Sequence, residues 1–181
     1  EQEKNGLYFY DRRPKFDVGR LHKINSRVAA YEKTGPTAPQ PDSQRDQSWQ
    51  VLVGAAADGE LCLPYRYTTT KPAADWLNAT FDDSNWRSGR APFGTIANPR
   101  TPWNSSDIWL RRTFSWNGKN FSAAALVIFH DEDTEVYVNG ELIWRGSGYK
   151  TAYEMFTVTD TLRRALRSGE NTAAVHKHQT G

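Results

Sequence analysis

The stretch LVIFHDEDTEVYVNG, residues 126–140, decides the fold class of this chain. Two apolar runs rich in β-forming residues, 126–129 and 136–138, flank an acidic segment at 130–133. The second run ends in Asn139-Gly140, a strong signal for a hairpin turn because both residues tolerate a positive φ. A third run, 142–144, follows at once. This pattern predicts an antiparallel meander of three strands whose first turn is the acidic segment.

Similar short runs recur from residue 49 onward, and turn signals such as Asn117-Gly118 separate many of them. Short strands separated by turn residues in this way are typical of a β-sandwich or a β-barrel. The other runs expected to form strands are 50–53, 65–69, 109–114, 155–158 and 172–178. Short helical pieces are expected near 73–78 and over 161–167, the second capped by Asp160.

The first 48 residues have a different character. A strand-like run at 7–10 is followed by apolar residues at helical spacing, which predict a helix over about 17–33. Residues 36–48 are rich in Pro, Gln, Asp, Ser and Thr and are typical of a linker. The predicted organisation is therefore a strand–helix appendage at 1–35, a linker at 36–48 and a β-domain at 49–181.

Composition excludes several classes of function. The chain has 23 basic and 21 acidic residues, so its net charge is only +2. This small positive charge argues against nucleic acid as the main partner. No run approaches the roughly 18 apolar residues of a membrane span. The single cysteine, Cys62, excludes an internal disulfide framework. No signal-peptide core is present, and we expect an extracellular or periplasmic protein whose signal was removed.

Five motifs, in this order, resemble the galactose-binding-like jelly roll found at the N-terminus of family-two glycoside hydrolases, such as β-galactosidases and β-glucuronidases. The resemblance covers roughly residues 65–179 and implies a mostly β, antiparallel sandwich preceded by the strand–helix appendage. The motifs are FDDSNW at 81–86 with APFG at 91–94, WLRRTF at 109–114, VYVNG at 136–140, Gly148-Tyr149, and GENT at 169–172.

The resemblance also implies a role. In that family the catalytic carboxylates sit on a separate barrel domain, which this chain lacks. We therefore expect a non-catalytic, carbohydrate-binding-like or bracing module of a secreted glycan-degrading enzyme, with carbohydrate and the remaining domains of a larger hydrolase as its partners. One alternative is a domain-packing module of another hydrolase, of the amidohydrolase type, with no sugar binding. A second is a fragment that completes a hydrolase active site in trans.

No catalytic residue is assigned, because the chain has no nucleophile elbow, phosphate-binding loop or metalloprotease helix motif. Sugar binding needs an aromatic platform and nearby planar polar groups. The candidates for carbohydrate binding are Trp103, Trp144, Tyr149 and Tyr153, with Asn104, Asp107 and Arg145. The alternative for most of the aromatic residues in the chain is a place in the core, which is expected for Trp86.

A metal site is the remaining hypothesis. His176 and His178 share one strand face because residues two apart point the same way. The jelly roll could bring them close to His130, Asp131 and Asp133. Structural calcium would use the carboxylates, whereas zinc would need the histidines. The alternative is that the acidic residues solvate a turn and that one histidine packs against a tryptophan. No other cofactor is expected.

Overall fold

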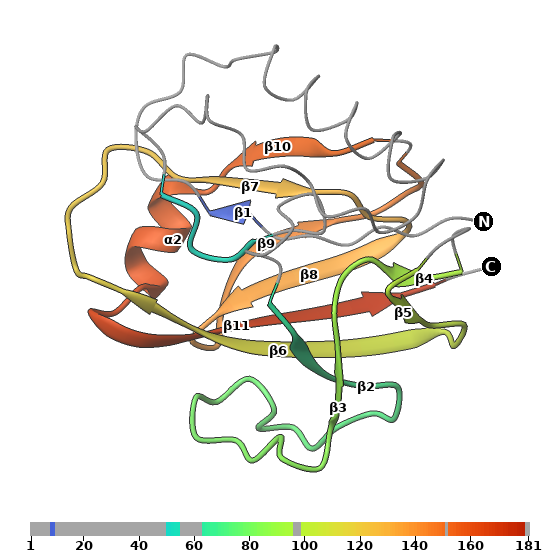
Figure 1. Cartoon of the computed structure of the whole chain (residues 1–181). Coiled ribbons are helices and arrows are strands. Elements are labelled where there is room, and N and C mark those ends of the chain that lie inside the picture. The colour runs from blue at the N-terminus through green and yellow to red at the C-terminus, as the bar shows by residue number, and fades with distance from the viewer. Residues whose placement is uncertain (1–7, 10–49, 55–62, 96–98, 151, 180–181) are drawn as a thin grey trace.

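The computed structural model describes residues 8–9, 50–54, 63–95, 99–150 and 152–179. Over these residues the chain forms two antiparallel sheets packed as a sandwich, which confirms the predicted fold class (Figure 1). The three-stranded sheet has the order β1 (Tyr8–Phe9), β7 (Ala125–Ile128) and β10 (Glu154–Thr157). The six-stranded sheet has the order β3 (Arg87–Gly89), β2 (Tyr65–Thr68), β6 (Asp107–Trp116), β11 (Gly169–His178), β8 (Asp133–Val138) and β9 (Glu141–Gly146).

Three small elements accompany the two sheets. β4 (Phe93–Gly94) and β5 (Thr101–Pro102) form a short parallel pair. The helix α2 (Thr159–Ala165) lies at one end of the sandwich (Figure 1). Its Thr161 hydroxyl donates to the carbonyl of Ile143 at 3.2 Å, so the helix is tied to the edge strand β9. No helix in the described part of the chain is long and apolar enough to cross a membrane.

The core lies between the two sheets and draws on their inward-facing side chains. In β8 the inward residues Thr134, Val136 and Val138 are all 1% exposed or less, and the residues between them are more exposed. Each apolar side chain buried in this way contributes about 1.5–3 kcal/mol. The alternation leaves the six-stranded sheet with an inner face in the core and an outer face.

The predicted meander is half confirmed. β8 and β9 form the hairpin, and Asn139 and Gly140 take the expected positive φ of 50° and 87°. The pairing of 126–129 with 136–138 is wrong, because β7 belongs to one sheet and β8 to the other. The acidic segment is therefore a corner between the sheets. Its His130 and Asp131 are buried, and Glu132 turns the chain with a φ of 57°.

Of the two short helices predicted from the sequence, one is absent and one is present. Residues 73–78 form turns instead of a helix, with bonds such as Trp76 N–H to the carbonyl of Ala73 at 3.1 Å. The second helix is confirmed as α2. Its N-cap, however, is Val158, which makes no side-chain capping bond, so the predicted cap was wrong. Asp160 lies in the first turn instead and pairs with Arg163 at 2.8 Å.

Two other expectations concern the N-terminal half. Residues 50–53 form irregular structure instead of a strand, although Val53 is fully buried in the core. The helix predicted over about 17–33 lies outside the described residues. The strand predicted at 7–10 is present as β1, which pairs with β7 through Tyr8↔Val127 and Phe9↔Leu126. The predicted appendage therefore contributes an edge strand to the sandwich.

Removal of residues 1–48 is expected to leave a folded domain that is less stable and prone to self-association. Loss of β1 leaves one edge of β7 unpaired, and an open edge is a template for pairing with another chain. The cost of losing this short ladder is about 1–2 kcal/mol. Urea unfolding and sedimentation velocity of the truncated and full chains make the comparison. A truncated chain with unchanged stability that remains monomeric would contradict the pairing.

The connection between β2 and β3, residues 69–86, packs against the outer face of the six-stranded sheet (Figure 1). Arg111 of β6, only 2% exposed, ties it there. Its Nε donates to Asp83 Oδ2 at 2.8 Å and its Nη2 to the carbonyl of Asn78 at 3.0 Å, and its Nη1 bonds the carbonyl of Trp76. The connection therefore covers one part of the outer face.

Two tryptophans lie differently from expectation. Trp86 was expected in the core, but it is half-buried in the 69–86 connection, with its ring centroid 5.7 Å from that of Phe81. Trp144, expected at the surface end of a strand, is half-buried and packs against the core. Its ring lies 5.1 Å from His130 and 4.8 Å from Phe156, centroid to centroid. The reason is the register, which pairs Trp144 with the inward-facing Val136.

Candidate functional site

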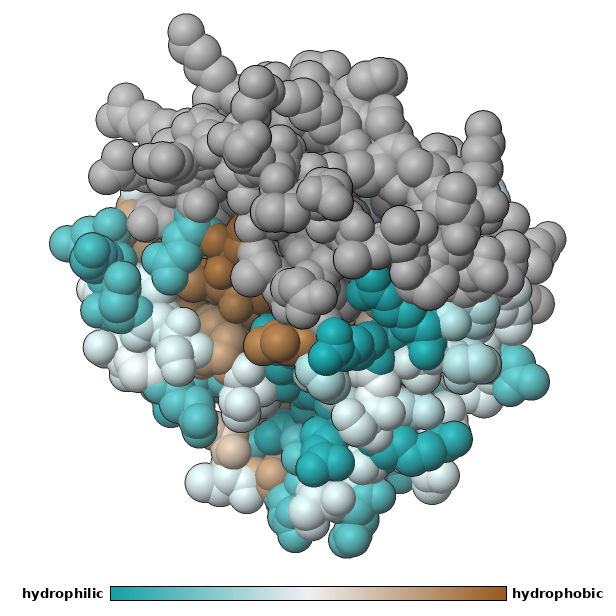
Figure 2. All heavy atoms as spheres, in the orientation of Figure 1, coloured by the Kyte–Doolittle hydropathy of each residue, from teal (hydrophilic) through white to brown (hydrophobic). Residues whose placement is uncertain are grey.

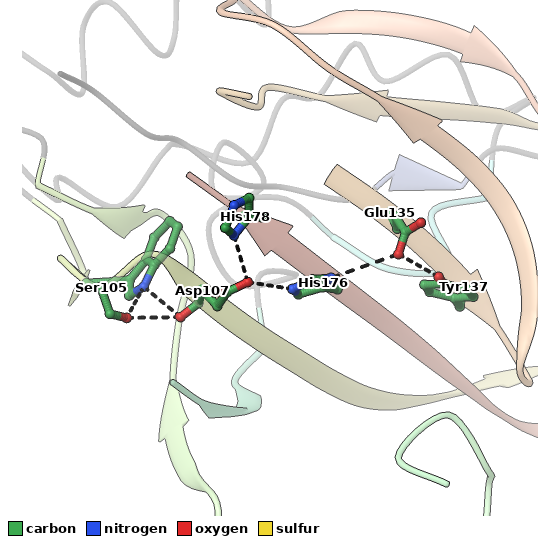
Figure 3. Close-up of polar contacts among 7 residues, drawn as sticks. Ser105, Asp107, Glu135, Tyr137, His176 and His178 are labelled. Atoms are coloured by element: carbon green, nitrogen blue, oxygen red, sulfur yellow. Dashed lines mark hydrogen bonds and ion pairs between the residues drawn. The ribbon is translucent and has the colours of Figure 1, made fainter. Parts of the chain in front are cut away.

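The outer face of the six-stranded sheet carries a row of polar side chains drawn from adjacent strands (Figure 3). Asp107 begins β6, His176 and His178 lie near the end of β11, and Glu135 and Tyr137 lie on β8. The register places His178 opposite Asp107 and His176 opposite Glu135. We call these five residues, together with Arg145 of β9, the polar row.

Hydrogen bonds join the residues at each side of the row, and a longer polar contact between His176 and Glu135 links the two sides. His176 Nε2 lies 2.8 Å and His178 Nδ1 3.0 Å from the same oxygen, Asp107 Oδ1. On the other side, His176 Nδ1 lies 3.9 Å from Glu135 Oε2. Tyr137 donates its hydroxyl to Glu135 Oε2 at 2.7 Å, and Arg145 Nη2 pairs with Glu135 Oε1 at 3.0 Å. Two carboxylates thus alternate with basic groups.

The network lowers the pKa of Asp107 and raises that of Tyr137, and both shifts favour the protonation states in which these residues make their hydrogen bonds. Burial alone would raise the pKa of Asp107, but hydrogen bonds and charge from His176 and His178 outweigh it, so the pKa is lowered. Burial and the bond to Glu135 raise the pKa of Tyr137 to about 12. At neutral pH Asp107 is therefore an ionised acceptor and Tyr137 a protonated donor.

The row is fixed but accessible. The exposed fraction is 28% for Asp107, 26% for His176 and 31% for Glu135, and 67% for Arg145. The His176 ring stacks on Trp109, with centroids 4.8 Å apart and planes 6° apart. At the other end Trp103 Nε1 donates to Ser105 Oγ at 2.7 Å and to the Asp107 carbonyl at 3.2 Å (Figure 3). Held donors and acceptors of this kind suit hydrogen bonds to hydroxyl groups.

The structure distributes the predicted carbohydrate-binding residues over three environments. Asp107 and Arg145 belong to the polar row, and Asn104 is exposed. Tyr149 is 58% exposed, in a loop where Gly148 has a φ of 77°. Trp103, Tyr153 and Trp144 face the interior: the first two are 4% and 1% exposed, and Trp144 packs against the core. Tyr149 is thus the exposed aromatic ring among the four candidates.

The five predicted metal ligands do not form one group. His176, His178 and Asp133 lie on the outer face, and Asp133 is the register partner of His178. His130 and Asp131 are buried in the corner between the sheets. Within residues 63–95, 99–150 and 152–179, no three His, Cys, Asp or Glu side chains are arranged to hold a metal ion. Both His176 and His130 contact tryptophan rings, and the calcium or zinc site stays a prediction.

Glu135, Tyr137 and Trp109 belong to the site but were not predicted from the sequence. A signal for the first two was present in the alternation of TEVYV at 134–138, in which every second residue faces outward. Their position beside His176 depends on the register of β11 between β6 and β8. That register joins segments about 40 or more residues apart along the chain, which local periodicity does not specify.

His130 gives the domain a pH-dependent stability. Burial lowers its pKa, the bond to Glu132 raises it, and the charges of Lys150 and Lys177 lower it further, with a net lowering. Below about pH 6.5 the unfolded chain therefore takes up a proton that the folded chain does not. We expect stability to fall as the pH drops below about 6.5, by at most about 1.4 kcal/mol per pH unit from this residue.

Urea unfolding between pH 5 and pH 8 measures this dependence. His130→Asn places an amide nitrogen where Nδ1 donates to the Glu132 carbonyl, but it does not titrate. The variant should lose stability less steeply than the original chain as the pH is lowered. Equal slopes for the two proteins would contradict the assignment.

No protein-family model and no curated protein matches this chain. Solved structures do match. The β-glucuronidase 2 of Bacteroides uniformis, covalently bound to cyclophellitol-6-carboxylate aziridine, is 18% identical, with a TM-score of 0.51 over 66% of this chain and 14% of that one. A family-two glycosyl hydrolase of Bacteroides cellulosilyticus is 20% identical, with a TM-score of 0.48 over 66% and 17%. A β-glycosidase of Bacteroides vulgatus is 21% identical, with a TM-score of 0.46 over 64% and 16%.

The likeness to the Bacteroides uniformis enzyme shows that this chain shares the fold of one part of that protein. It bears out the resemblance drawn from the motifs of residues 81–172 at the level of fold. The present chain spans about one-seventh to one-sixth of the length of these three proteins.

Proposed function

We propose that this chain is a non-catalytic sandwich module of a larger, secreted glycan-degrading enzyme and that its polar row binds carbohydrate. The observation that carries the proposal is the row itself. Asp107, His176 and Glu135 are held by their mutual contacts on an accessible sheet face. Carboxylates and imidazoles fixed in this way can accept from and donate to adjacent sugar hydroxyls with little ordering cost.

The fold supports the proposal that the chain is one module of a longer enzyme. The likeness to the Bacteroides uniformis β-glucuronidase covers 14% of that protein, so a module of this kind is one component of a much longer chain there. Fold alone does not carry activity over to this chain. The chemistry of its own outer face is therefore the argument for carbohydrate, and the remaining domains of a larger hydrolase are the second proposed partner.

A bracing role is the second candidate. The half-exposed Glu135–Arg145 pair and the stacked Trp109–His176 pair could also form the polar rim of a contact with another domain. Figure 2 shows that much of the described surface in this view is hydrophilic or intermediate, which is also compatible with a domain interface. The two roles differ in whether the isolated chain binds sugar.

The chain should bind at least one neutral or acidic oligosaccharide on a glycan array, and titration calorimetry then gives the dissociation constant. We expect Glu135→Ala and Asp107→Ala to raise that constant about tenfold each, since each removes charge-assisted hydrogen bonds. The matched control is Glu170→Ala, which removes an exposed carboxylate at the far end of β11.

Absence of sugar binding up to millimolar concentration would reject the carbohydrate role and leave bracing. Equal weakening by Glu170→Ala would show that the effect is one of net charge. If Tyr149→Ala abolishes binding while both variants in the polar row bind normally, the sugar site lies at the Gly148-Tyr149 loop instead.

A further inference from the structure

Two Asn-Gly pairs lie in the described part of the chain. Asn139-Gly140 forms the turn between β8 and β9, and Asn117-Gly118 comes directly after β6. Asn-Gly is the pair in which an asparagine deamidates most readily, because glycine has no side chain to hinder the approach of its backbone nitrogen. The reaction needs the asparagine side chain to turn toward that nitrogen. The contacts that hold each side chain therefore decide which pair reacts.

The Asn139 side chain is held firmly. It is half-buried, and its Nδ2 donates to the carbonyl of Ala165 at 2.9 Å and to Asn171 Oδ1 at 2.7 Å. Its Oδ1 accepts from Thr172 N–H at 2.9 Å. Rotation of this side chain into a reactive position would break these bonds inside the domain, so it needs a local opening of the turn.

The Asn117 side chain is held much less. It is exposed, and its Oδ1 accepts a hydrogen bond from Lys119 N–H at 3.0 Å. The residue lies in the irregular loop between β6 and β7, just beyond Trp116, the last residue of β6. Exchanging that bond for a bond to solvent costs little at an exposed position. The Asn117 side chain can therefore rotate without any opening of the sandwich.

We propose that Asn117 is a site of spontaneous deamidation in the folded chain, whereas Asn139 is protected. The backbone nitrogen of Gly118 loses its proton to base and attacks Cγ of Asn117, which forms a new N–C bond. The bond between Cγ and Nδ2 breaks, and the amide nitrogen takes up a proton and leaves as ammonia. Water then hydrolyses the cyclic imide at either of its carbonyls, which yields aspartate or isoaspartate. No oxidant or reductant enters the reaction.

The modification changes the end of the six-stranded sheet that lies farthest from the polar row. Both products add a negative charge, and isoaspartate lengthens the backbone by an extra carbon. Gly118 lies close to the turn before β11, since a Cβ placed on it would be 2.9 Å from Ser168 Oγ. The next residue, Gly169, is the register partner of Trp116. Asp107 is at the other end of β6, so we expect the polar row to stay unchanged.

Peptide mapping by mass spectrometry tests the proposal. One sample of the full chain is incubated folded in mildly alkaline buffer, and a second is incubated unfolded in guanidinium chloride. Digestion after lysine and arginine places the two asparagines in different peptides, residues 113–119 and 120–145. In the unfolded sample we expect similar rates, because glycine follows both asparagines. In the folded sample we expect Asn139 to react at least about tenfold more slowly than Asn117, because its hydrogen bonds must break first.

Asn120 is the control within the same loop. It is exposed like Asn117, but Phe121 follows it, and that side chain hinders the attacking nitrogen, so Asn120 should stay intact. Asn117→Gln should abolish the change in the 113–119 peptide, because glutamine forms the corresponding imide far more slowly. Equal rates at Asn117 and Asn139 in the folded chain would overturn the proposal. So would an Asn117 that reacts only when the chain is unfolded, or one that reacts no faster than Asn120.

Discussion

Replacing Asn171 with leucine is expected to destabilise the domain by about 3–5 kcal/mol, a large share of a small domain's stability. Asn171 is 1% exposed and makes four hydrogen bonds. Its Nδ2 donates to the carbonyls of Arg167 at 2.7 Å and Gly169 at 2.9 Å. Its Oδ1 accepts from the N–H of Arg167 at 2.8 Å and from Asn139 Nδ2 at 2.7 Å.

Leucine has the same branching as asparagine but lacks its polar atoms and is larger, so the loss would come from the polar groups left unpaired inside the domain and from overpacking. Asn139 also joins the hairpin turn to β11, because its Oδ1 accepts from Thr172 N–H at 2.9 Å. Chemical unfolding measures the change. Asn117→Leu is the control, because Asn117 is exposed and makes one local bond to Lys119 N–H. Similar losses for the two variants would show that the network adds nothing beyond a turn bond.

Arg111→Met is expected to cost about 2–4 kcal/mol and to release the 69–86 connection from the sheet. The guanidinium is buried and satisfies Asp83 and two backbone carbonyls of that connection. Methionine fills part of the space but leaves the carbonyls of Trp76 and Asn78 without their donor. Asp83 is 27% exposed and regains water, which keeps the cost below that of a fully buried pair.

Hydrogen exchange locates the effect, since residues 76–86 should exchange faster while β6 and β11 stay protected. Arg66→Met is the matched control. Arg66 is the register partner of Arg111 on β2, but it is exposed and makes one long bond, 3.3 Å, to the Trp86 carbonyl. A global loss of protection in Arg111→Met, or an equal effect in Arg66→Met, would contradict the tethering role.

A strand such as β8 could be predicted from the sequence because its side chains alternate between buried and more exposed positions and it ends in a turn residue. The turn at Asn139-Gly140 formed as expected because its positive φ values are a local requirement. The pairing of β7 could not be predicted in this way. Residues 126–129 and 136–138 look like hairpin partners along the chain, but they lie in different sheets. Only packing across the core distinguishes a corner from a turn.

The candidate site was predictable where it depended on local geometry. His176 and His178 share a face because a strand has a period of two, and both contact Asp107 as a result. The burial of Trp103 and Tyr153 was not predictable, because aromatic residues with polar groups occur both in cores and at ligand sites. Long-range register and burial decide such cases, and neither is encoded in a short window of sequence.

The most direct test of the proposed function is to map a bound sugar by nuclear magnetic resonance. The oligosaccharide that binds best on the array is titrated into the ¹⁵N-labelled full chain. The account predicts that the largest amide shifts occur at Asp107, Glu135 and His176 on the outer face, and that they saturate with the calorimetric dissociation constant. Binding whose shifts cluster elsewhere, with these three amides unmoved, would contradict the assignment of the polar row as the carbohydrate site.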